Sequence, residues 1–316
     1  MGRRDDLMEL LRPPAHRAPL IAAGAVLFTV GVVLEEQRLD EALPLGVHLV
    51  LVAAAAALLL AVALLSPLEG ARPSPSQSVL LVCGLLLFFL ALVRLSDALG
   101  GTGEPTAGTL TWTSLALAAV AAYPARRRNS AIATMITAVA LGVAVLAAAQ
   151  WLFGPVGITA YRWLLLALAV VCVLASLAVR GARPRDAELL VITGGLATLA
   201  IPVIAAAQVL LPIGGGDEVL PAFWELVALA AGCGLIAYGA VDRVPGAAWL
   251  GVAHLVAFLI VVNAGAEETL LWWPLILLLL GGGVMAAGLR PRRPLPPEPA
   301  GYSVERPLAS RTDDER

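Results

Sequence analysis

The sequence predicts an all-α protein, a polytopic transmembrane helix bundle of about ten spans. Hydrophobic residues make up 59% of the 316 residues and charged residues only 14%, whereas soluble domains carry about 25% charge. Apolar runs of about 18 residues or more recur along the chain, and each can cross a hydrocarbon core of roughly 30 Å as a helix. A soluble fold could not hide so many helices that are apolar on every side.

The spans follow one another with short connections, and helix is the only open structure that keeps all backbone hydrogen bonds within one segment in lipid. The expected spans are 18–36, 45–65, 78–98, 107–123, 130–151, 161–179, 188–210, 221–240, 247–264 and 270–289. The first follows a basic flank but has no small-residue cleavage site before Glu35 and Glu36, so we expect an uncleaved span. The fourth is short and begins with several threonines.

The predicted transmembrane domain covers 18–289. The segment 1–17 is expected to be cytoplasmic, and 290–316 forms a Pro/Arg-rich tail whose composition is typical of disorder. Eighteen of the 21 arginines fall on the side that holds both termini, and only Arg38, Arg94 and Arg162 fall on the other side. Because basic residues collect on the cytoplasmic side, both termini are predicted to be cytoplasmic.

The positions of the tryptophans support the predicted span ends, and the amino-acid composition indicates the kind of membrane. Tryptophans prefer the membrane–water interface, and six of the seven fall at predicted outer ends of spans, while Trp249 falls at an inner end. The chain has no lysine, and its Ala, Gly, Leu, Val, Pro and Arg content is typical of a GC-rich bacterial genome. The expected location is therefore the bacterial cytoplasmic (inner) membrane.

The even-numbered spans resemble one another at their outer ends. Aligning Trp112, Trp163, Trp224 and Trp273 places similar Ala/Leu/Val strings together, and Cys172 and Cys233 lie 61 residues apart, as do Pro184 and Pro245. This pattern favours a two-helix hairpin that is repeated several times in one orientation. Chance similarity between low-complexity apolar strings is the alternative.

No motif with chemical specificity occurs in the chain. It has no P-loop, no dinucleotide fingerprint, no His-Glu-x-x-His zinc site and no Gly-x-Ser-x-Gly nucleophile elbow, and it contains only three histidines. We therefore expect no enzyme, no catalytic residue, no metal and no cofactor. The expected partners are the lipid bilayer and either a small solute or another membrane protein, with no nucleic acid.

His254 is the most central ionisable residue, near the middle of the ninth span. The simplest expectation is a neutral histidine hydrogen-bonded to a neighbouring helix. The alternatives are a proton acceptor in a coupled carrier, or a soft-metal ligand together with Cys172 and Cys233. Intramembrane ionisable groups are costly to bury, so each is a candidate for function.

Other polar or helix-breaking residues within spans complete the candidate substrate or proton pathway. These are Gln150, Gln208, Pro202, Asn263 and Arg94, beside His254. Arg94 and Asp97 are three residues apart, so they share a helix face and are expected to pair. Pro202 removes a backbone donor and frees a carbonyl. Arg162 and Glu225 are instead expected to reach headgroups and water at the interface.

The function best suited to this architecture is a small secondary transporter or permease-like protein. The alternative is a non-transporting membrane scaffold or an accessory subunit of a membrane complex. The shortage of deep carboxylates favours this alternative, because proton-coupled carriers usually need a buried one.

Overall fold

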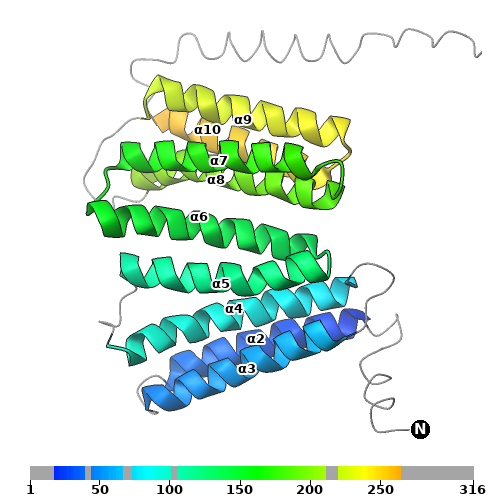
Figure 1. Cartoon of the computed structure of the whole chain (residues 1–316). Helices are drawn as coiled ribbons and strands as arrows, with labels where there is room; N and C mark the ends of the chain where they lie inside the picture. The colour runs from blue at the N-terminus through cyan, green and yellow to red at the C-terminus, as the bar shows by residue number, and fades with distance from the viewer. Residues whose placement is uncertain (1–17, 40–43, 67–72, 101–105, 211–219, 265–316) are drawn as a thin grey trace, which may run out of the picture. The chain divides into compact units, whose positions relative to one another are not determined.

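The computed structural model describes residues 18–39, 44–66, 73–100, 106–210 and 220–264, and this part of the chain is helical throughout, without strands. Figure 1 shows its nine helices. They are α2 (Ala18–Leu39), α3 (Leu45–Leu65), α4 (Pro75–Ala98), α5 (Ala107–Arg127), α6 (Ala131–Phe153), α7 (Ile158–Val179), α8 (Pro184–Leu210), α9 (Ala222–Val241) and α10 (Pro245–Ala264). The expected span 270–289 and the segments 1–17 and 290–316 lie outside the described residues.

Eight of these nine helices are long and apolar enough to cross a membrane, which supports transmembrane helices and an integral membrane protein. The helix not among them is α5, which coincides with the expected span 107–123. Several hydroxyl groups and two terminal arginines, Arg126 and Arg127, lower its hydropathy. Its deepest polar side chains are covered by protein, because Thr113 and Ser114 are 0% and 2% exposed.

Local sequence explains why α4 begins before the expected boundary. The Ser74 hydroxyl accepts a hydrogen bond from the Gln77 N–H, and the Gln77 side chain accepts one from the Ser74 N–H. Pro75 follows at the first helical position, where its missing N–H costs nothing. This capping box starts the helix three residues earlier than hydropathy indicates.

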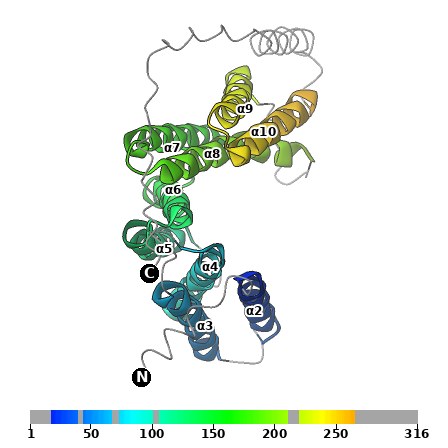
Figure 2. The ribbon, with the colours of Figure 1, turned by 90° about the vertical axis from the view of Figure 1, so that its right-hand side faces the viewer.

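The most extensive helix contacts join consecutive helices in pairs: α3 with α4, α5 with α6, α7 with α8, and α9 with α10. Figure 2 shows the helices nearly end-on, with α2 beside α3 and α4. Short connections on the arginine-rich side close three of the four pairs: 128–130, 180–183 and 242–244. The duplication of a hairpin stays a prediction. Among the described helices, those that carry Trp112, Trp163 and Trp224 (α5, α7 and α9) each pair with the helix that follows.

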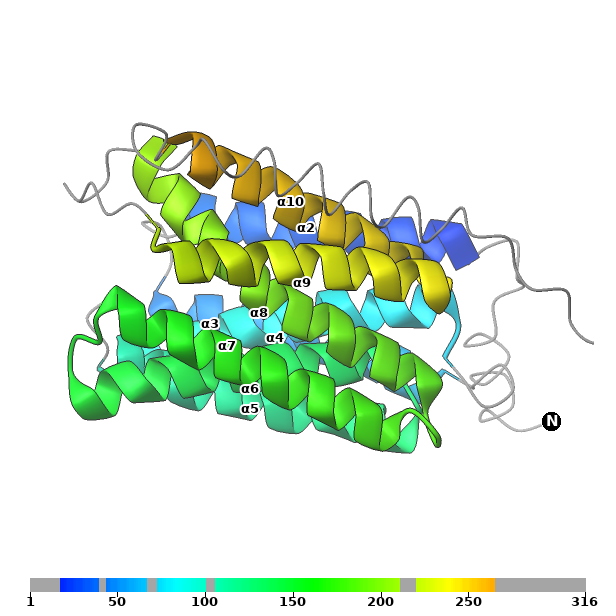
Figure 3. The ribbon, with the colours of Figure 1, turned by 90° about the horizontal axis from the view of Figure 1, so that it is seen from above.

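Small residues set the spacing within these pairs. A Cβ atom added to Gly251 on α10 would lie 2.6 Å from the carbonyl oxygen of Gly232 on α9, so the two backbones touch. Ala248 approaches Gly239 in the same way. Close approach through glycine and alanine is the ordinary means of helix association in lipid, where apolar burial gives little driving force. Figure 3 shows α9 and α10 as neighbours that lie closest where α9 ends and α10 begins.

Apolar clusters fill the contacts: one among α2 to α6, one among α7 to α10, and a smaller one of Leu235, Val244 and Ala247 where α9 meets α10. Large apolar side chains also cover much of the outer surface, for example Leu27, Leu58 and Leu177. A surface of this kind matches hydrocarbon rather than water. Trp224 differs from the expected interfacial tryptophans, because it is only 4% exposed and packs within the second cluster.

Candidate functional site

A polar cluster joins the last turns of α2, the first turn of α3 and the last turns of α4. Glu36 and His48 are 7% and 2% exposed, and Arg94 donates from Nε to the Glu36 carboxylate. Nη1 of Arg94 also lies 3.8 Å from Oδ2 of Asp97, which confirms the expected pairing within α4. The structure adds Glu36, 58 residues earlier in the chain, as the closer partner.

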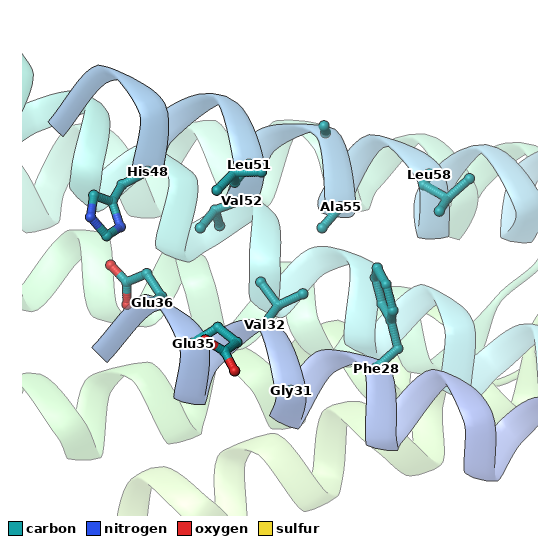
Figure 4. Close-up of a pocket in the computed structure, with 11 residues that line it drawn as sticks. Phe28, Gly31, Val32, Glu35, Glu36, His48, Leu51, Val52, Ala55 and Leu58 are labelled. Carbon is teal, nitrogen blue, oxygen red and sulfur yellow. The ribbon is translucent and has the colours of Figure 1, made fainter. Parts of the chain in front are cut away.

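A groove of about 530 Å³ between α2 and α3 ends at this cluster. Its walls are apolar, from side chains such as Phe28, Val32, Leu51 and Leu58. Figure 4 shows His48 and Glu36 pointing toward each other at one end of the groove, while Phe28 and Leu58 lie toward the other end. This volume is in the usual range for small-molecule sites.

Small residues create the space in this groove. Gly31 lines it on α2, and Ala54 and Ala55 line it on α3. A Cβ atom added to Gly31 would meet nothing within 4 Å, so the space beside it is open. Contacts between α2 and α3 are correspondingly few, and α2 is held mainly by α4.

The charge at the Glu36 end of the groove is negative on balance. Among the lining residues, Glu35, Glu36 and His48 are the ionisable ones. Arg94 offsets the charge of Glu36, and Asp97 and Glu35 add two further carboxylates. An apolar groove that ends in excess negative charge favours an amphiphile with a cationic head.

His254 lies at a second, separate place, between α10 and α8. It is 0% exposed; its Nδ1 lies 2.9 Å from the Leu250 carbonyl oxygen and its Nε2 lies 3.0 Å from the Thr198 hydroxyl. A fully buried histidine hydrogen-bonded to a neighbouring helix is the simplest of the three expectations for this residue.

Pro202 lies on α8 one turn after Thr198, and its side chain is fully buried. Because proline has no N–H, the Thr198 carbonyl loses its usual helical donor. Two of the candidate residues, Pro202 and His254, therefore meet at Thr198. Thr198 itself could not be found from the sequence, because a threonine in a membrane helix has no distinguishing neighbours along the chain.

The remaining candidates are distributed along the bundle. Gln150, at the end of α6, is exposed and accepts a hydrogen bond of 3.0 Å from the Tyr161 hydroxyl of α7. The side chains of Gln208 and Asn263 lie outside the described part of the structure. The described candidates thus fall in three places: Arg94 by α2 and α3, Gln150 at the α6–α7 end, and His254 with Pro202 on α10 and α8.

Arg162 and Glu225 correct an expectation. Both are only 4% exposed, so they do not reach headgroups and water as predicted. Nη2 of Arg162 is buried and finds no hydrogen-bond partner among the described residues. Their neighbours in sequence pack across the two helices: Trp163 of α7 and Phe223 and Trp224 of α9 are in mutual ring contact, with centroids 5.0 to 5.5 Å apart.

The soft-metal hypothesis for His254 gains no support. Cys172 is buried on α7 and Cys233 is exposed on α9, and His254 makes its two hydrogen bonds to Leu250 and Thr198. Within the described ranges, no group of three or more His, Cys, Asp or Glu side chains could hold a metal ion.

Comparison of the chain with protein-family models, curated proteins and solved structures finds no significant match.

Proposed function

We propose that this protein is a small membrane carrier, rather than an enzyme, and that its substrates are apolar molecules with a cationic group. The observation that carries the proposal is the groove between α2 and α3, which is apolar along its walls and ends at Glu35 and Glu36. A lipophilic cation can place its apolar part between Phe28 and Leu58 and its charge beside the carboxylates.

Three carboxylates are buried in the described part of the structure, which the sequence did not predict, and their burial supports this proposal. Glu36, Asp186 and Glu225 are 7%, 6% and 4% exposed, although all three lie near helix ends. Glu36 lies at the groove, where its charge can respond to a bound cation or proton. Buried carboxylates of this kind are typical of ion-coupled pathways in membranes.

We further propose that the chain lies in a bacterial cytoplasmic membrane with both termini in the cytoplasm. The arginine asymmetry supports this orientation, because the connections 128–130, 180–183 and 242–244 hold arginines and, by alternation of the helices, face the same side as the start of α2. The expected span 270–289 would return the C-terminus to this side. In this orientation the Glu36 end of the groove faces the outer side.

The groove offers a sharp test with a matched control. Gly31→Leu fills the groove, and Gly24→Leu places the same side chain two turns earlier on α2, where an added Cβ also meets nothing within 4 Å. The full chain is reconstituted in lipid vesicles, and uptake of ethidium, a lipophilic cation, is followed by fluorescence. We expect Gly31→Leu to abolish uptake and Gly24→Leu to retain it.

The same uptake assay tests whether the negative charge at the groove selects cations. Uptake of an anionic dye of similar size should be absent, and Glu35→Gln should reduce cation uptake about tenfold or more through loss of one carboxylate interaction. Equal transport of both dyes, or equal uptake by the two leucine variants, would contradict the proposed site. No flux of either dye, with stable co-purification of another membrane protein, would select the scaffold or accessory-subunit alternative.

A further inference from the structure

When the His254 ring is neutral, the contacts around it contain more hydrogen-bond acceptors than protons to fill them. The Nδ1 atom lies 2.9 Å from the Leu250 carbonyl oxygen, which can only accept, so Nδ1 carries a proton. The Thr198 hydroxyl lies 3.0 Å from Nε2, 2.9 Å from the Gly195 carbonyl oxygen and 3.3 Å from the Gly194 carbonyl oxygen. A hydroxyl has a single proton, so when the imidazole is neutral it donates either to the ring or to the carbonyl oxygens of its own helix.

Protonation of the ring resolves this competition. With a proton on Nε2, the ring donates to the Thr198 oxygen, and the Thr198 hydroxyl donates to Gly195. The Nδ1–H bond to Leu250 is unchanged. Every short contact then contains one proton, and the change needs only rotation of one hydroxyl, with no movement of heavy atoms. The geometry therefore accepts both protonation states of His254.

Thr198 also borders a cavity of about 330 Å³ between α7, α8 and α9. The cavity extends from Thr198 past Ser176 to Arg180 and Tyr238, near the ends of α7 and α9. His254 does not line the cavity, whereas Thr198, whose hydroxyl contacts the imidazole, does. We propose that His254 is a proton-binding site that is reached from this cavity through the Thr198 hydroxyl.

The other ionisable groups on the neighbouring helices lie toward helix ends or are engaged elsewhere, so His254 and Thr198 are the groups that would hold the proton. The helices α8 and α9 pack against α10. On α8 the ionisable residues Arg185, Asp186 and Glu188 lie in the first two turns, and on α9 Glu225 lies in the first turn. Cys233 is exposed, Tyr238 lies near the end of α9, and the Arg180 of the cavity pairs with Asp242 at 2.7 Å. The two bonds of His254 go to Thr198 and Leu250.

The site does not depend on the carrier proposal, because it lies on other helices than the groove. Its test uses the full chain with ¹⁵N-labelled histidine in lipid bilayers, with the His254 signals assigned by their loss in His254→Asn. As the pH is lowered from about 8 to about 4, a range that brackets histidine titration, the Nε2 signal should move from unprotonated to protonated. A His254 ring that stays neutral over the whole range would overturn the proposal.

Two variants separate affinity from access. Thr198→Val removes the acceptor and should weaken proton binding about tenfold, while Thr198→Ser should titrate like the wild type. Gly234→Leu fills the cavity, since an added Cβ at Gly234 meets nothing within 4 Å, and should slow deuterium exchange at His254. If Thr198→Val titrates like the wild type, the Thr198 oxygen does not accept the bound proton's hydrogen bond. If Gly234→Leu exchanges at the wild-type rate, the route through the cavity is wrong. Either result overturns the proposed site as described. If Thr198→Val does not fold, the serine variant and the wild type still decide the first point.

Discussion

Arg128, which follows the end of α5, donates a hydrogen bond of 2.7 Å from Nη2 to the carbonyl oxygen of Ser66, the C-cap residue of α3. Its Nη1 donates to the Ala63 carbonyl oxygen at the same distance. The last carbonyls of a helix have no partner within the helix, and a cation there also interacts favourably with the helix dipole. One arginine therefore ties the end of α3 to the end of α5.

Replacement of this arginine should lower stability. Arg128→Ala removes two charge-assisted hydrogen bonds, so we expect the free energy of unfolding in mixed micelles to fall by about 2 kcal/mol. Arg127→Ala is the matched control, because Arg127 is exposed and its loss changes the charge of the same connection equally. If the two variants lose the same stability, charge and not the cap is responsible.

The contact between α9 and α10 should not tolerate a side chain. Gly251→Ala places a methyl group against the backbone of Gly232, so overpacking should cost about 1 to 3 kcal/mol. Gly234→Ala lies on α9 in open space, and the better helix propensity of alanine should make it neutral or slightly stabilising. Thermal unfolding of both variants in detergent measures the difference, and equal melting temperatures would contradict the tight contact.

Glu36 and Arg94 should be coupled energetically. Glu36 is buried and Arg94 is partly exposed. Arg94→Met leaves the buried Glu36 charge without Arg94 and should destabilise by about 3 kcal/mol, whereas Glu36→Gln leaves Arg94 beside Asp97 and should cost less. The double variant should lose less than the two single losses together, with a coupling of about 1 to 3 kcal/mol. A double-mutant cycle on the free energy of unfolding checks this. Additive losses would show that the two side chains act separately.

The least apolar helix should still cross the bilayer. The helix α5 has 21 residues, enough for about 30 Å of rise, and its buried hydroxyls are shielded by neighbouring helices. Alkaline phosphatase fused after Gly100 should be active outside, whereas fusion after Asn129 should be inactive and fluorescent protein there should be bright. Reporters at both positions on one side would remove α5 from the spans.

The sequence by itself determined where the apolar helices lie. Transfer of a segment into hydrocarbon depends on its own side chains and its own backbone bonds, so hydropathy located α2 to α10 within a few residues. Local chemistry also explains why three helices start earlier than hydropathy predicts. The capping box of Ser74 and Gln77 begins α4, and Pro184 and Pro245 are the first residues of α8 and α10. The pair Arg94–Asp97 was likewise predictable, because helix geometry fixes its spacing.

Only the tertiary structure decided which residues meet across helices. Glu36 and Arg94 are 58 residues apart, and His254 and Thr198 are 56 apart, so no local pattern relates them. The groove beside Gly31 and the burial of Arg162 depend in the same way on how separate helices pack. In lipid, helix association is governed by close fit and by hydrogen bonds between particular side chains, and these are properties of pairs of surfaces rather than of any one segment.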